Sequence, residues 1–87
     1  MTMQVLSYQN GKPWNPSHDP LVFICVDGEW VAWRIFLRQR SPMHKYDTID
    51  SLLRRGQLWD WNEARLAHPE WHLEEDINID LRVGLGL

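Results

Sequence analysis

Residues 21–38 read LVFICVDGEWVAWRIFLR, and this stretch decides the fold because it contains a complete β-hairpin. Asp27-Gly28 lies between two runs of β-branched and aromatic residues, which is the strongest short-range signal for a two-residue type I′ turn. A turn at this position pairs Val26 with Glu29 and, further from the turn, Val22 with Trp33. The stretch therefore predicts two antiparallel strands together with their register.

The two faces of this hairpin differ in character because side chains alternate along a strand. One face is apolar throughout and is expected to be a core: Val22, Ile24, Val26, Val31, Trp33, Ile35 and Leu37. The other face mixes apolar and aromatic side chains with two arginines: Phe23, Cys25, Trp30, Ala32, Arg34, Phe36 and Arg38. This second face is either another core layer, covered by Trp14 and its neighbouring prolines, or a surface for a partner.

The rest of the chain predicts a small α+β domain. Strands are expected at 3–8 and 77–83, and short helices at 49–55 and 60–67. The polar stretch 39–46 contains Pro42 and is expected to be a loop. The predicted order is β-β-β-α-α-β, which gives a mainly antiparallel four-stranded sheet with the two short helices on one face.

Composition favours one soluble globular domain over residues 1–87, with 44% hydrophobic and 24% charged residues. No run of about 18 apolar residues is present, so a membrane helix is not expected. Residues 1–20 lack the pattern of a signal peptide. The single cysteine, Cys25, lies within an apolar strand and is expected to be a buried, inert thiol. A reducing, cytoplasmic location is therefore expected.

No motif for catalysis or for a cofactor stands out. His68 and His72 are four residues apart with Glu75 beyond them, which is a spacing that zinc could use on one helical face. Pro69 disturbs that geometry, so we expect His68 to flank the start of a helix, His72 to be an exposed helical residue, and no metal site. A glycine-rich phosphate loop followed by a helix is also missing. We therefore expect a protein that is not an enzyme and that needs no cofactor.

Six tryptophans in 87 residues are more than a small core ordinarily uses. Trp59 and Trp61 flank Asp60 at the expected start of a helix, and Trp71 follows among acidic residues. One interpretation makes Trp59 a hydrophobic staple before the helix and places Trp61 against the sheet. The other interpretation gathers the three indoles into an aromatic and acidic docking surface.

These observations favour a protein-binding module that occludes or bridges a protein partner, such as a small inhibitor, an immunity protein, a phage counter-defence protein or an accessory subunit; self-association is a further form of the same idea. The candidate contact residues are Trp30, Arg34, Phe36, Arg38, Trp59, Trp61 and Trp71. The alternative is nucleic-acid binding through residues 34–55, which hold six basic and two acidic side chains, together with the sheet aromatics. The net charge of −3 argues against that alternative.

Overall fold

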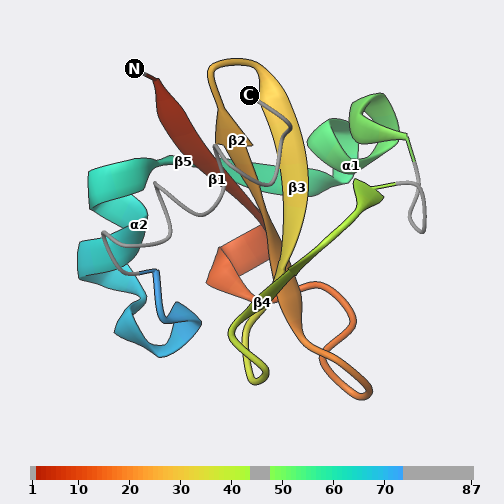
Figure 1. The fold of residues 1–87 in the computed structure, drawn as a ribbon, viewed down its shortest axis with the longest axis vertical. Helices are drawn as coiled ribbons and strands as arrows, with labels where there is room; N and C mark the ends of the chain where they lie inside the picture. Colours follow the sequence, from red (N-terminus) through yellow and green to blue (C-terminus); the bar gives the residue numbers. More distant parts are fainter. Residues whose placement is uncertain (1, 44–47, 74–87) are drawn as a thin grey trace.

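The computed structural model describes residues 2–43 and 48–73 and confirms an α+β domain built on an antiparallel sheet. The sheet has five strands in the order β4-β3-β2-β1-β5 (Figure 1). The strands are β1 (Met3–Tyr8), β2 (Leu21–Val26), β3 (Glu29–Arg34), β4 (Gln39–Ser41) and β5 (Gly56–Asp60). The helices are α1 (Ile49–Arg55) and α2 (Trp61–Ala67), with the short 3-10 turns η1 (Gln9–Gly11) and η3 (Pro69–Trp71).

The predicted hairpin is confirmed residue by residue. Val26 pairs with Glu29, and the register continues without a bulge to Val22 opposite Trp33. Asp27 and Gly28 both have positive φ angles, 50° and 87°, as a type I′ turn requires. The local sequence thus sets both the turn and the side to which each side chain points.

Two strands were not predicted. β4 has only three residues, and its sequence Gln-Arg-Ser carries no apolar alternation that would mark a strand. β5 lies where the sequence suggested a helix stop and a hydrophobic staple, and its residues pair with residues of β1 that lie 48 to 56 positions earlier in the chain. The expected strand at 77–83 lies outside the described residues.

The helix boundaries follow their local signals. α1 has the predicted bounds, with Asp50 in its first turn and Gly56 directly after its last residue. The carboxylate of Asp60 accepts a hydrogen bond from the backbone N–H of Asn62 at 3.1 Å and so caps α2. α2 ends at Ala67, before Pro69.

The expectation that both helices cover one face is wrong, because they pack on opposite faces of the sheet (Figure 1). α2 contributes Trp61 and Ala64 to the core of the first face, whereas α1 contributes Leu52 to the core of the second. The reason is β5, which connects the helices directly and lies within the sheet. The chain leaves one face through this strand and begins the next helix on the other.

The first face of the sheet carries the larger core. Its buried members are Met3, Val5, Val22, Ile24, Val26, Val31, Trp33, Ile35, Trp61, Ala64, Trp71 and Leu73. Leu37 was expected in this core, but its side chain is 52% exposed. The strand ends at Arg34, so strand alternation no longer governs the residues that follow it.

The second face of the hairpin is a second core layer and not an open surface. Leu6, Leu21, Phe23, Ala32 and Leu52 are buried there, with Trp14, Trp30, Met43 and Ile49 packed around them. The ring of Trp14 lies edge-on against Phe23, with 5.8 Å between the ring centroids. The alternative in which the N-terminal connection covers this face is therefore confirmed.

Candidate functional site

Two of the tryptophans expected at a docking surface belong to the core. Trp71 is 1% exposed and Trp61 is 7% exposed, and both pack in the first core. The interpretation that places Trp61 and Trp71 on an exposed aromatic and acidic docking surface is therefore wrong. Acidic neighbours in sequence did not indicate exposure, because η3 turns the indole of Trp71 inward while Glu70 remains exposed.

Trp59 and Trp61 both reach the first core, although they are only two residues apart. Trp59 lies on β5 opposite Val5, and Trp61 is the first residue of α2, so the backbone changes from strand to helix between them. The indole Nε1 of Trp59 donates a hydrogen bond to the Oγ of Ser7 at 2.9 Å. Its ring meets that of Trp71 edge-on, with 5.8 Å between centroids. Trp59 is therefore a half-buried structural residue.

Trp30 is also half-buried and structural in position. It lies opposite Cys25 on the hairpin and packs at the edge of the second core. Met43 and Ile49 border that same cluster. Trp30, one of the candidate contact residues, therefore packs partly against the second core.

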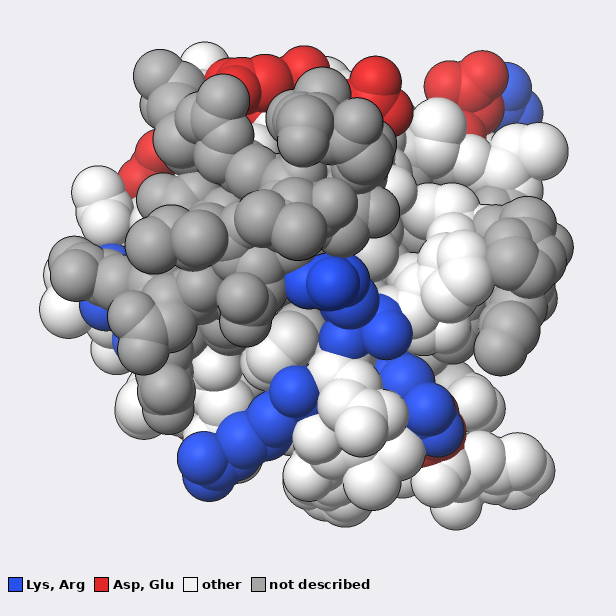
Figure 2. Space-filling model, in the orientation of Figure 1, with Lys and Arg blue, Asp and Glu red and all other residues white. Residues whose placement is uncertain are grey.

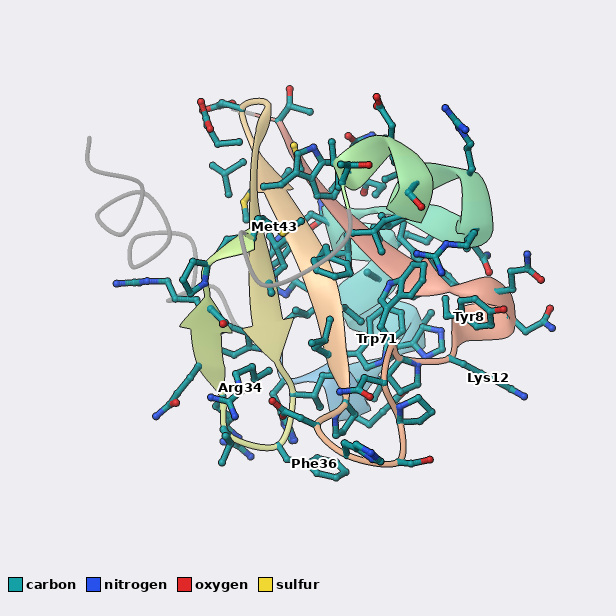
Figure 3. All side chains as sticks on the ribbon, turned by 90° about the vertical axis from the view of Figure 1, so that its right-hand side faces the viewer. Tyr8, Lys12, Arg34, Phe36, Met43 and Trp71 are labelled. Carbon is teal, nitrogen blue, oxygen red and sulfur yellow. The ribbon has the colours of Figure 1, made fainter. Side chains whose placement is uncertain are left out.

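The remaining candidates gather at the turn between β3 and β4. Phe36 is 76% exposed and Leu37 is 52% exposed, which makes them two adjacent large apolar side chains in water. Figure 3 shows Phe36 projecting away from the strands at one end of the molecule. The turn is anchored because Ile35 is buried and its N–H donates to the carbonyl of Pro20 at 2.9 Å.

Three arginines lie on the strands and the turn that carry these two apolar side chains. Side chains two residues apart on a strand share a face, so Arg34 lies on the second face with Ala32. Cross-strand pairs also share a face, so Arg40, opposite Trp33, lies on the first. Arg38 lies in the turn itself, with a φ of 51°. We call this surface the β3–β4 tip and define it as Arg34, Phe36, Leu37, Arg38 and Arg40. It combines an apolar apex with cations on both sides.

The position of Arg34 is fixed by an ion pair. Its Nε lies 2.6 Å from the Oδ2 of Asp19, and both side chains are about one-third exposed, at 33% and 29%. The pair ties the end of β3 to the connection before β2. An exposed pair of this kind adds little stability but orients the guanidinium.

On the face that Figure 2 shows, the charged side chains of the described residues are unevenly distributed. Figure 2 shows Lys and Arg side chains gathered around β4 on the lower half of this face, while most Asp and Glu side chains lie along the upper rim near the β2–β3 turn. The tip therefore carries a local positive charge although the chain has a net charge of −3. An acidic surface on a partner would be attracted to this end of the molecule.

Two members of the tip, Leu37 and Arg40, were not among the candidate residues for protein contact, although Arg40 belongs to the basic stretch 34–55. Leu37 was assigned to the core because the strand was extended past Arg34, and Arg40 was assigned to a loop. The polar run Arg38-Gln39-Arg40 directly after Leu37 was the available signal that the apolar alternation had ended.

The basic stretch 34–55 does not form one continuous surface in the described residues. Arg34, Arg38 and Arg40 surround the tip, whereas Arg55 lies at the end of α1 with its guanidinium 5.6 Å from the ring centroid of Trp14. Of the two aromatic residues expected to stack on bases, Trp30 packs at the edge of the second core, whereas Phe36 is exposed at the tip. Within the described residues, the basic side chains of 34–55 are therefore divided between the tip and α1.

His68 and His72 have separate roles. The imidazole of His68 stacks on Trp71, with 4.0 Å between centroids, and its Nδ1 lies 2.8 Å from Glu70 Oε2. His72 ends η3 in the left-handed conformation, with a φ of 59°. Within residues 2–43 and 48–73, no group of three His, Cys, Asp or Glu side chains could hold a metal ion.

Cys25 is buried, as predicted, and burial raises the pKa of its thiol above the ordinary value of 9.0. The thiolate is the reactive form, so we expect iodoacetamide at pH 8 to alkylate Cys25 more slowly in the native protein than in urea. As the pH rises, the Cys25 thiol of the unfolded chain loses its proton before the buried thiol of the folded protein does. The contribution of Cys25 to the free energy of unfolding is therefore fully present below pH 9.0 and is lost as the pH rises through the folded pKa. Mass spectrometry of timed samples measures the alkylation, and equal rates in both states would contradict the burial.

Comparisons with protein-family models, with curated proteins and with solved structures found no match. Within the part of the chain that the structure describes, no helix is long and apolar enough to cross a membrane. The geometry of the β3–β4 tip is therefore the main guide to function.

Proposed function

We propose that this protein is a non-enzymatic binding module that docks its β3–β4 tip into an apolar cleft on an acidic protein partner. The single observation that carries the proposal is the exposed Phe36–Leu37 pair with arginines on both sides of it. Interface hot spots commonly consist of a buried aromatic anchor within a polar, charged rim. By filling such a cleft, the module would occlude the partner or bridge it to another protein.

The arginines of the tip favour a different protein over a second copy of this chain as the partner. Two tips that met face to face would bring their arginines together, and like charges at an interface disfavour association. The anchored base of the turn also means that little order must be gained on binding. The buried single thiol is compatible with the cytoplasmic location that we propose.

Nucleic-acid binding is the second candidate, because Phe36 could stack on a base while Arg38 and Arg40 contact phosphates. The two candidates differ in their dependence on salt. Phosphate contacts make affinity fall steeply as salt rises, whereas an apolar anchor is affected much less. Measuring the affinity for the isolated partner at several salt concentrations therefore separates them.

The test is affinity isolation from native cells, with the wild type compared with Phe36→Ser and with the matched control Leu66→Ser. Leu66 is 85% exposed on α2, so both substitutions replace a large exposed apolar side chain and leave the folded core unchanged. We expect Phe36→Ser to weaken binding of the captured partner about tenfold or more, as loss of a hot-spot residue does. The control should bind like the wild type.

The competing outcomes are distinct. A partner that is retained equally by Phe36→Ser and the wild type would contradict the role of the tip. A nuclease-sensitive partner with a steep salt dependence would replace the protein-binding proposal with the nucleic-acid one. Tip-dependent dimerisation of the purified protein, measured by analytical ultracentrifugation, would replace it with self-association.

A further inference from the structure

A second recessed surface lies apart from the tip, where the N-terminal connection meets the end of α1. It is a pocket of about 290 Å³ whose lining includes Tyr8, Lys12, Pro13, Trp14, Pro16 and Arg55. This volume is at the small end of the range for ligand pockets in proteins. It suits a small molecule better than a folded partner.

The aromatic wall of this pocket is held in place before any ligand arrives. The Nε1 of Trp14 donates a hydrogen bond to the carbonyl of Leu6 at 3.1 Å, and its backbone forms a two-way bridge with Leu21. The rings of Trp14 and Tyr8 meet edge-on, with 5.1 Å between centroids. A prepared wall lowers the entropy cost of binding.

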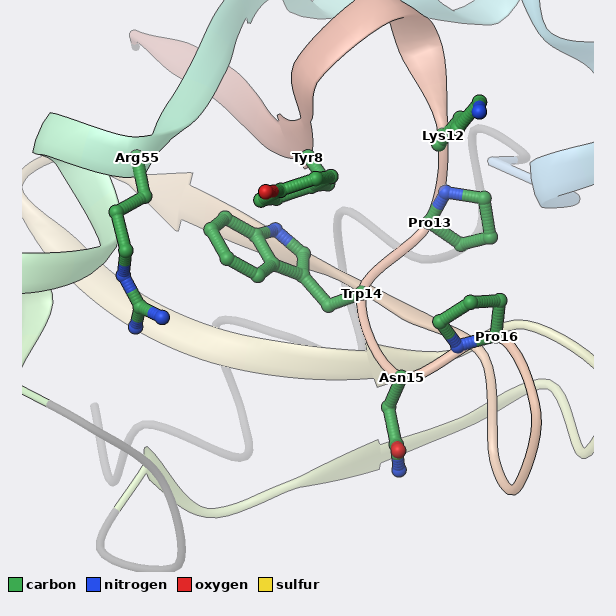
Figure 4. A pocket seen from close by; sticks show the side chains of 7 residues that line it. All are labelled: Tyr8, Lys12, Pro13, Trp14, Asn15, Pro16 and Arg55. Carbon is green, nitrogen blue, oxygen red and sulfur yellow. The ribbon is translucent and has the colours of Figure 1, made fainter.

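The pocket also pairs flat apolar walls with positive charge. Figure 4 shows Arg55 on one side of the two rings and Lys12 with Pro13 on the other. Arg55 lies over the Trp14 ring, with 5.6 Å between its Cζ and the centroid. No described residue that lines the pocket is acidic. A ligand with one flat ring and one anionic group would match both properties.

We propose that this pocket binds a small aromatic phosphate of about the size of a nucleoside monophosphate. The ring would lie against Trp14 and Tyr8, because nucleobases stack on aromatic side chains with little dependence on base identity. The phosphate would accept hydrogen bonds from Arg55, whose planar guanidinium suits phosphate oxygens, and Lys12 would add positive charge. This site shares no residue with the β3–β4 tip and is independent of the function proposed for it.

The test follows the indole N–H signal of Trp14 by NMR during titration with AMP, adenosine and ribose 5-phosphate. A Trp14→Phe variant identifies the signal among the six tryptophans. We expect AMP to shift it in a saturable manner, and adenosine and ribose 5-phosphate to bind at least tenfold more weakly. These two probes carry the ring and the phosphate separately.

Two arginine variants then distinguish binding of AMP in the pocket from attraction of AMP to the positive charge of α1 in general. Arg55→Gln should weaken AMP binding about tenfold, whereas Arg54→Gln, which removes the neighbouring exposed cation outside the pocket, should leave it unchanged. The proposal is overturned if AMP leaves the Trp14 signal unmoved at millimolar concentration. It is also overturned if either partial probe binds as well as AMP, or if the two arginine variants behave alike.

Discussion

A Trp71→Ala variant is expected to lose about 3–5 kcal/mol of unfolding free energy, the usual cost of removing a large aromatic side chain from a core. Trp71 has the largest fully buried side chain among the described residues. Its ring contacts both Trp59 and His68, and its backbone carbonyl accepts the indole N–H of Trp33 at 3.0 Å. Since small domains have only about 5–15 kcal/mol of unfolding free energy, this substitution removes a large part of it.

Urea denaturation followed by circular dichroism measures this loss. Leu66→Ala is the matched control, because Leu66 is 85% exposed and its truncation should change the unfolding free energy by no more than about 0.5 kcal/mol. If Trp71→Ala unfolded at the same urea concentration as this control, η3 would not be packed on the sheet as described.

A Gly56→Ala variant is expected to lose roughly 2–3 kcal/mol, in the upper part of the range for overpacked sites. A Cβ at this position would lie 2.6 Å from the backbone oxygen of Ser7 and 2.8 Å from Cζ2 of Trp14. The φ of Gly56 is −102°, so the cost would come from contact and not from backbone strain. Either β5 would move away from β1 or the Trp14 ring would be displaced.

The comparison is Gln57→Ala, which changes the next residue of the same strand. Gln57 is exposed, and its truncation should alter stability by at most about 0.5 kcal/mol. Thermal unfolding of the two variants side by side measures the difference. Equal midpoints would mean that β5 does not approach β1 and Trp14 as closely as the structure indicates.

The elements that were predicted correctly are those with a complete local signal. The β2–β3 hairpin has its own turn and two alternating strands, and α2 has its own cap at Asp60. In each case neighbouring residues are sufficient to select the backbone conformation. The first face of the hairpin was correctly assigned to the core for all members except Leu37.

The elements that were missed depend on distant partners. β5 is a strand because its backbone pairs with that of β1, and no sequence pattern within Gly56–Asp60 predicts this pairing. Without β5 in the sheet, the sequence offers no reason to place the two short helices on opposite faces. Pairings between segments far apart in sequence are decided by tertiary contacts, which local propensity does not contain.

The candidate site shows the same division. Phe36 and Arg38 were selected because they alternate with Trp30 on a strand, yet they are exposed because the strand has already ended. The acidic neighbours of Trp61 and Trp71 suggested an exposed surface, but charged neighbours in sequence do not determine whether an indole side chain points into the core or into solvent. The Trp14 pocket could not be predicted, because Tyr8, Trp14 and Arg55 come from three segments that only the folded sheet brings together.

The place of β1 in the sheet has a consequence for how the protein is made. β1 is synthesised before the other described strands, yet one of its two neighbours is β5, whose last residue is Asp60. Until that segment leaves the ribosome, one edge of β1 lacks its partner and presents unpaired backbone groups to other chains. Between synthesis of the hairpin and synthesis of β5, this edge of β1 is therefore open to wrong pairing with other chains.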